Sequence, residues 1–228
     1  MRLRPPRAPH LTRREEHNLE REAEEDILRR GAAGDRAGIG ELLEEYRPRL
    51  ARMIGVRMDP TLRGRVDASD VIQEAYVEVA ERLPRYLQNR EMPFFLWVRF
   101  LTGQKLLQIH RRHVEAGVRD VRCEISLQQG GIAGASSMTL ASAILDGGST
   151  PSQVAMREEE RLSLVQALGE LSEVDREILA MRHFERLSLA ETADLLGISE
   201  SAASRRHVKA LGRLQQHMRR LIPPSTAT

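Results

Sequence analysis

The sequence has few aromatic residues, one cysteine and no long apolar run, and each shortage excludes a class of protein. Aromatic residues make up only 4% of the chain, so Ala and Leu must fill its core, which favours helices over strands. Cys123 stands alone and cannot form an internal disulfide, which favours a reducing, cytoplasmic setting. No apolar run approaches the roughly 18 residues of a membrane span, so we expect no membrane insertion.

Motifs of catalysis and cofactor binding are also missing. The chain has no glycine-rich phosphate loop and no CxxC pair. His110 and His113 are the only candidate metal dyad, and their basic surroundings oppose a cation. Asp67 and Asp70 form the only compact acidic pair near a basic stretch, and helix capping explains them. We therefore expect no enzyme, no metal and no cofactor.

Positive charge is concentrated in two stretches of a chain whose net charge is only +2. Residues 99–113 contain four Arg or Lys residues and no acidic residue, and residues 199–220 contain six against one glutamate. Solvated helix faces would explain either stretch alone. Two separate basic stretches together favour contact with nucleic acid at two places.

Apolar spacing predicts an all-α protein with two small helical domains joined by a flexible linker. Leu42, Leu43, Tyr46, Leu50 and Ile54 form one stripe, and a second helix follows Asp67 and ends at Pro84. The predicted organisation begins with a partly disordered N-terminal extension (1–25) and a first domain (26–113). A Gly/Ser-rich linker (114–152), with a short helix near 139–145, then leads to a helix-turn-helix domain (153–222) and a tail (223–228).

The strongest local pattern is a helix-turn-helix over residues 189–206. Ser188 and Glu191 form a capping box, Gly197 suits a left-handed turn, and Ser199 caps the second helix. An ordinary helical hairpin is the alternative reading. The residues predicted to face a DNA groove are Ser201, Ser204, Arg205, Arg206, Val208 and Lys209.

The segment Leu168–Phe184 and the helix-turn-helix after it resemble the C-terminal domain of extracytoplasmic-function (ECF) sigma factors, in the bacterial sigma-70 family. This resemblance implies that the domain binds the upstream promoter element and the flap of RNA polymerase. The groove-facing residues above would then contact the upstream element.

The segment Asp70–Val79 resembles the sigma-factor helix that docks on the polymerase clamp. Asp70, Gln73, Glu74 and Val77 recur at i, i+3, i+4 and i+7, so they share one side of a helix and are the predicted polymerase contacts. A solvated acidic face is the alternative explanation of this spacing.

Three of the four Phe residues and the only Trp lie between residues 94 and 100, beside basic residues. Such a mixture can stack unpaired bases and hold phosphates. The ECF family places start-proximal promoter reading and strand separation in this region. Trp97 is expected in the core, and the predicted DNA contacts are Arg99, Gln104, Lys105, Gln108, Arg111 and Arg112.

Together these features predict an alternative sigma factor that binds the clamp and flap of the polymerase core and directs it to promoter DNA. An anti-sigma factor is a candidate further partner. The alternative is a free-standing helix-turn-helix regulator, which would carry a sensor or dimerisation domain in place of the docking and aromatic helices.

Overall fold

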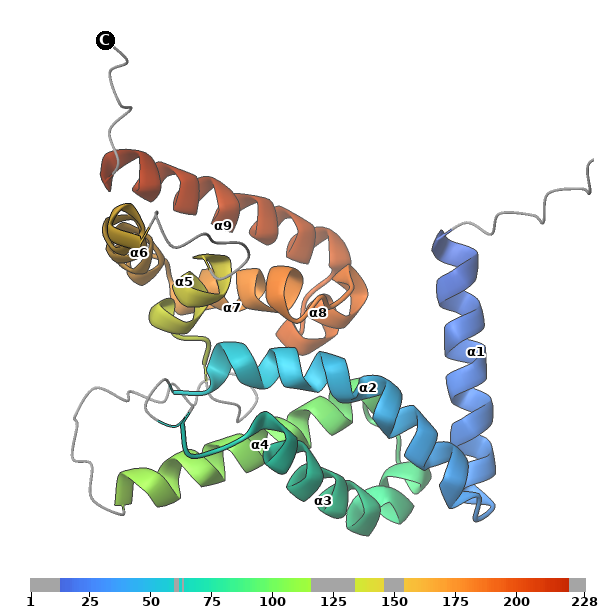
Figure 1. Cartoon of the computed structure of the whole chain (residues 1–228). Helices are drawn as coiled ribbons and strands as arrows, with labels where there is room; N and C mark the ends of the chain where they lie inside the picture. Colours follow the sequence, from blue (N-terminus) through green and yellow to red (C-terminus); the bar gives the residue numbers. More distant parts are fainter. Residues whose placement is uncertain (1–12, 60–61, 63, 116–133, 146–153, 222–228) are drawn as a thin grey trace, which may run out of the picture.

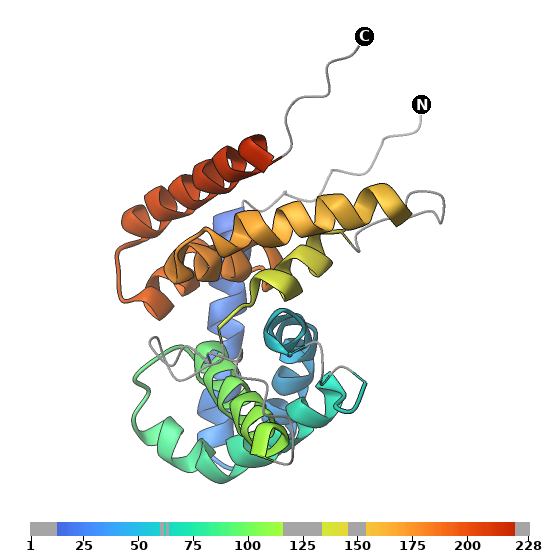
Figure 2. The same ribbon diagram turned by 90° about the vertical axis from the view of Figure 1, so that its left-hand side faces the viewer.

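The computed structural model describes residues 13–59, 62, 64–115, 134–145 and 154–221. Every regular element in these ranges is a helix, which confirms the all-α prediction. Figures 1 and 2 show two helical units stacked on each other, with α1–α4 in one and α5–α9 in the other. No helix in the described ranges is long and apolar enough to cross a membrane.

The first unit is built around one apolar core. The predicted stripe from Leu42 to Ile54 is buried at all five positions, and Tyr46 reaches α1 by donating a hydrogen bond to Glu24 Oε2 (2.6 Å). Leu50 and Ile54 are completely buried, and each such side chain stabilises the fold by about 1.5–3 kcal/mol. The helices are α1 (Arg13–Ala32), α2 (Arg36–Arg57), α3 (Ala68–Gln88) and α4 (Phe94–Glu115).

Helix α3 continues through Pro84 to Gln88, so the prediction that Pro84 ends it is wrong. Pro84 lies on the exposed side of the helix near its end. The turn after it is held from outside the helix, because Tyr86 is buried against Phe94, with ring centroids 5.3 Å apart. The Tyr86 hydroxyl also donates a hydrogen bond to the Met92 carbonyl oxygen (2.9 Å). These tertiary contacts offset the backbone hydrogen bond that proline cannot make.

The second unit has its own apolar core, in which Leu140, Leu168 and Ile178 are buried together. Its elements are α5 (Ser137–Leu145), α6 (Val154–Gly169), α7 (Glu173–Leu179), a π-helical turn η2 (Ala180–Phe184), α8 (Leu189–Leu196) and α9 (Glu200–Leu221). Helix α5 matches the short helix predicted inside the linker. Most of that linker, 116–133 and 146–153, lies outside the described residues.

Helix α2 lies between the two units and belongs to both (Figure 1). Val56 packs in the core of the second unit, whereas Met181 and Leu187 pack in the core of the first. The Thr139 hydroxyl donates a hydrogen bond to the Val56 carbonyl oxygen (2.7 Å). We call this boundary the domain interface.

Candidate nucleic-acid and protein interfaces

The predicted polymerase contacts lie on the exposed side of α3. Asp70, Gln73 and Glu74 are exposed, and Val77 exposes 61% of its surface. The opposite side of α3 is buried in the first core. Asp67 begins the helix, as predicted, because its carboxylate accepts a hydrogen bond from the Ser69 N–H (2.7 Å). The structure therefore brings the four residues into one solvent-facing stripe, available to a partner.

The predicted DNA contacts on α4 do not share one surface. Gln108, Arg111 and Arg112 are exposed. Lys105 is largely buried, and its Nζ lies 3.6 Å from Glu78 and 3.9 Å from Glu74 on α3. Gln104 is half-buried. Arg99 stands apart, because its side chain turns into the domain interface.

A buried ion-pair cluster occupies that interface. Arg99 donates hydrogen bonds from Nε to Glu185 Oε2 (2.6 Å) and from Nη2 to Oε1 (3.2 Å). Arg57 also pairs with Glu185, and its Nη2 donates to Glu177 Oε2 (2.6 Å). Burial raises the pKa of Glu185, but the charges and hydrogen bonds of Arg57 and Arg99 outweigh it and lower that pKa to about 2.

This cluster explains why Arg99 differs from the other α4 residues. Its side chain is 4% exposed, and its guanidinium is paired with a carboxylate from the second unit. In this arrangement of the two units Arg99 does not face DNA. Sequence spacing gave no sign of it, because the partner lies 86 residues away.

The helix-turn-helix has the local geometry that its sequence predicts. Ser188 accepts from the Glu191 N–H (3.1 Å) and Glu191 accepts from the Ser188 N–H (2.7 Å), which completes the capping box. Gly197 adopts a left-handed conformation with φ of 61°, which places α9 across α8. Ser199 accepts a hydrogen bond from the Ala202 N–H (3.3 Å) at the start of α9.

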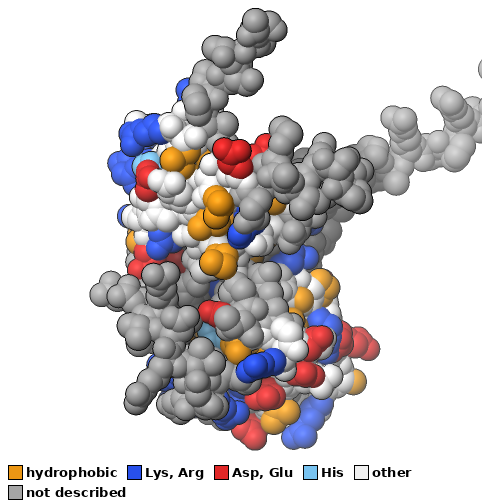
Figure 3. Space-filling view, turned by 60° about the vertical axis from the view of Figure 1, so that its left-hand side comes forward, with side chains coloured by type: hydrophobic (Ala, Val, Ile, Leu, Met, Phe, Trp, Pro, Cys, Tyr) orange, Lys and Arg blue, Asp and Glu red, His pale blue; other side chains and the backbone are white. Residues whose placement is uncertain are grey.

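Helix α9 presents a polar, basic side to solvent. Ala203 and Ala210 are buried against the unit, while Arg205, Arg206 and Lys209 are exposed. Val208 exposes 65% of its surface, Ser201 is exposed and Ser204 is half-buried. The three basic residues form no ion pair with any described residue. Figure 3 shows basic side chains gathered on this unit at the upper left of the molecule.

A pocket of about 670 Å³ between α3 and α4 was not predicted from the sequence. Tyr86 and Trp97 stack in it with centroids 4.5 Å apart, and burial raises the pKa of the Tyr86 hydroxyl to about 12. Arg82, Arg85 and Asn89 line the same pocket. The run Arg-Leu-Pro-Arg-Tyr from residue 82 is the signal that could have found them, because it places arginines just before the aromatic cluster.

Comparison with known proteins agrees with this geometry. The family model described as "Sigma-70, region 4" matches residues 167–216, which span α7, α8 and most of α9. The "ECF RNA polymerase sigma factor SigD" of Mycobacterium tuberculosis is 28% identical over 192 residues, covering 84% of this chain and 82% of the relative, and the Mycobacterium bovis protein matches equally. These matches support an ECF sigma factor. The chain is therefore an alternative sigma factor that directs transcription initiation.

Two solved structures are also similar to this sigma factor. One is CnrH in complex with the cytosolic domain of CnrY, with a TM-score of 0.49 and 19% identity over 85% of this chain and 96% of that one. The other is the sigma factor RpoE in complex with the anti-sigma factor NepR from Bartonella quintana, with a TM-score of 0.43 and 16% identity over 79% and 96% of the two chains.

Proposed function

We propose that this sigma factor divides its work among three surfaces. The α3 stripe of Asp70, Gln73, Glu74 and Val77 binds the clamp of the polymerase core. The exposed side of α4, with the aromatic pocket beside it, meets the start-proximal promoter element. The exposed side of α9 reads the upstream element. The proposed domains remain 26–113 and 153–222, joined by 114–152.

The single observation that carries this proposal is the complete helix-turn-helix with unpaired cations on its outer side. Arg205, Arg206 and Lys209 are exposed and lack acidic partners among the described residues, so phosphates or base edges can meet them without breaking an existing ion pair. Arg can pair bidentately with guanine, whereas Lys more often meets phosphate. The N-terminal half of α9 is therefore suited to a DNA groove.

The aromatic pocket suits an unpaired base. The Trp97 and Tyr86 rings are stacked, and Arg82 and Arg85 are exposed at its rim. Aromatic faces stack bases of any sequence, and neighbouring cations hold the phosphates. A base leaving the duplex near the start site would find both kinds of contact here.

The two promoter surfaces need a partner to bind DNA tightly together. Each basic surface supplies few phosphate contacts, and such contacts weaken as salt rises. A partner that holds both units on one DNA molecule converts two weak contacts into a strong one through effective concentration. Core polymerase is that partner in this proposal. Polymerase then supplies the chemistry of transcription. The protein therefore works in the cytoplasm, where promoter DNA lies, and an anti-sigma factor there would compete with polymerase for it.

The test combines gel filtration with promoter binding. The full chain should co-elute with purified core polymerase, bind promoter DNA poorly by itself at physiological salt, and support specific transcription with core. The matched control is core without the chain. Tight, selective promoter binding by the chain alone, with no gain from core, would instead establish the free-standing regulator.

A further inference from the structure

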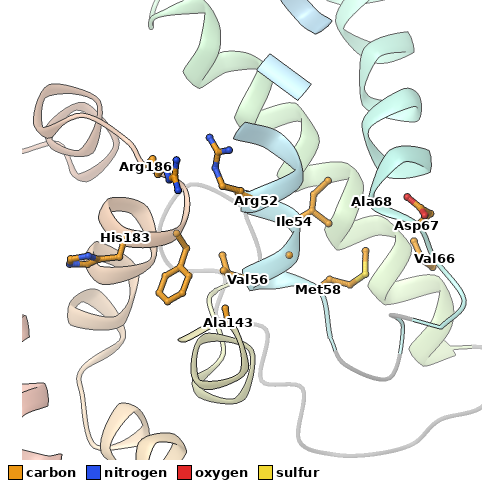
Figure 4. A pocket seen from close by; sticks show the side chains of 12 residues that line it. Arg52, Ile54, Val56, Met58, Val66, Asp67, Ala68, Ala143, His183 and Arg186 are labelled. Carbon is orange, nitrogen blue, oxygen red and sulfur yellow. The ribbon is translucent and has the colours of Figure 1, made fainter. Parts of the chain in front are cut away.

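One pocket of the domain interface is left without a role by polymerase and promoter binding. It has a volume of about 620 Å³ and lies between α2, α5, the start of α3 and the end of η2, with Arg186 just after η2. Figure 4 shows Arg52 on α2 and Arg186 on the second unit with their side chains close together at one end. Apolar side chains, among them Ile54, Val56 and Phe184, line the rest.

The two arginines differ from three other arginines of this interface. Arg49, Arg57 and Arg99 each pair with a glutamate of the second unit. Arg52 and Arg186 form no ion pair with a described residue, and the buried Nε of Arg52 has no hydrogen-bond partner there. An unpaired buried donor costs about 1–3 kcal/mol. The pKa of Arg52 is lowered by burial, and then by the charges of Arg186 and Arg49.

Backbone geometry holds this pair in place. Arg186 is the one non-glycine residue with positive φ (58°) among the described residues. Glu185, directly before it, is buried and paired with Arg57 and Arg99, whereas Arg186 is exposed. A strained backbone conformation of this kind costs about 1–3 kcal/mol and is typical of sites with a function.

We propose that this pocket binds a phosphate-bearing small molecule of mononucleotide size, with its phosphates held by Arg52 and Arg186. Two guanidinium groups match the charge and the acceptor geometry of a phosphate. The volume lies within the range of about 300–1,000 Å³ that small-molecule sites occupy. The apolar lining suits the base and sugar of a nucleotide. Asp67, the only acidic residue among the described residues that line the pocket, lies at the far end in Figure 4.

Binding would also link the two units. Arg52 and Arg186 come from different units, so a phosphate between them replaces repulsion with two attractive contacts across the domain interface. A ligand that binds only when the units are packed favours that packing. The site therefore goes beyond the proposed contacts with polymerase and promoter, and it can be tested on the isolated chain.

The experiment measures binding of adenosine diphosphate, guanosine diphosphate and inorganic pyrophosphate to the full chain by calorimetry and thermal unfolding. We expect saturable binding of a nucleoside diphosphate, tighter than pyrophosphate, and a rise in Tm of about 5–11 °C at a hundredfold excess over Kd. Arg52→Gln and Arg186→Gln should each weaken binding at least tenfold. Arg52→Lys keeps the positive charge but removes the planar guanidinium. An equal loss of affinity in this variant shows that the paired N–H donors of the guanidinium are needed.

The matched control is Arg36→Gln, an exposed arginine of the same helix outside the pocket. It should bind like the wild type. Far-UV circular dichroism confirms that each variant is folded. The proposal is overturned if neither nucleotide binds saturably, or if affinity is unchanged in both pocket variants. Equal affinity for pyrophosphate would overturn the nucleotide assignment, because the apolar lining would then contribute nothing.

Discussion

Arg99 on α4 and Glu185, directly after η2, form an ion pair with two hydrogen bonds in which both side chains are almost fully buried. The pair joins the helix proposed to meet the start-proximal element to the unit proposed to read the upstream element. Arg57 pairs with the same carboxylate, and Glu177 supplies the second negative charge for these two buried cations. The contact therefore couples the stability of the domain interface to the availability of Arg99.

Replacing Glu185 should destabilise the chain strongly. Glu185→Gln leaves Arg99 without its buried carboxylate and Arg57 with Glu177 alone, and breaking a buried pair in this way costs about 3–5 kcal/mol. Urea unfolding followed by circular dichroism measures the loss. Glu44→Gln, which removes one partner of an exposed pair with Arg47, is the control and should leave the unfolding free energy unchanged. Equal stability of both variants would contradict a cooperative interface.

The same carboxylate predicts a pH dependence. The pKa of Glu185 in the folded state is about 2, below the ordinary 4.5 of a glutamate, so its contribution to stability is fully present above pH 4.5 and is lost as pH falls toward 2. Wild type should therefore lose more unfolding free energy over this window than Glu185→Gln. The measurement is the difference between the unfolding free energies of the two proteins as a function of pH. The contributions of titrating groups that both proteins share, such as Glu24, cancel in this difference. Parallel curves would show that Glu185 is not held charged.

Polymerase binding should depend on the α3 stripe. Gln73→Ala combined with Glu74→Lys should weaken core binding by about 2–5 kcal/mol, because a carboxylate facing a partner cation is reversed. Helix content should not change, since both positions are exposed. Competition against the wild-type chain for core measures the effect. Glu41→Lys, an exposed charge reversal on α2, is the control, and unchanged core affinity of the double variant would disprove the docking assignment.

The exposed side of α9 should separate base reading from phosphate binding. Arg205→Ala should lose about 1–3 kcal/mol of discrimination at one upstream position, whereas Lys209→Ala should weaken binding evenly and reduce its salt dependence. Holoenzyme binding to a set of single-base promoter variants, at several salt concentrations, measures both. Gln216→Ala, exposed farther along α9, is the control. If neither variant changes promoter binding, another side of α9 faces the groove.

The aromatic pocket should act on unpaired DNA only. Trp97→Leu removes an aromatic face and should cost the holoenzyme about 1–3 kcal/mol in binding a single-stranded start-proximal oligonucleotide. Trp97→Phe should retain most of the affinity. Binding to a duplex that carries the upstream element alone is the internal control and should not change. A matched loss on both DNAs would mean that Trp97 acts through folding.

The features that depend on neighbours within a few residues could be predicted from the sequence. The Ser188–Glu191 capping box, the left-handed Gly197, the apolar stripe of α2 and the exposed stripe of α3 all follow from helical periodicity and local hydrogen bonding. The short helix α5 was predicted for the same reason. These interactions close over one or two turns, so a pattern of spacing contains them.

The features that form where distant segments meet could not be predicted from the sequence. Arg99 has the same local pattern as the other basic residues of α4, yet it is buried because Glu185 supplies a carboxylate from another unit. Pro84 does not end α3, because Tyr86 is anchored by Phe94 and Met92 after it. The pocket with Arg52 and Arg186 exists only where α2 meets the second unit. Burial and ion pairing depend on the partner's position in space, and spacing along the chain does not encode that position.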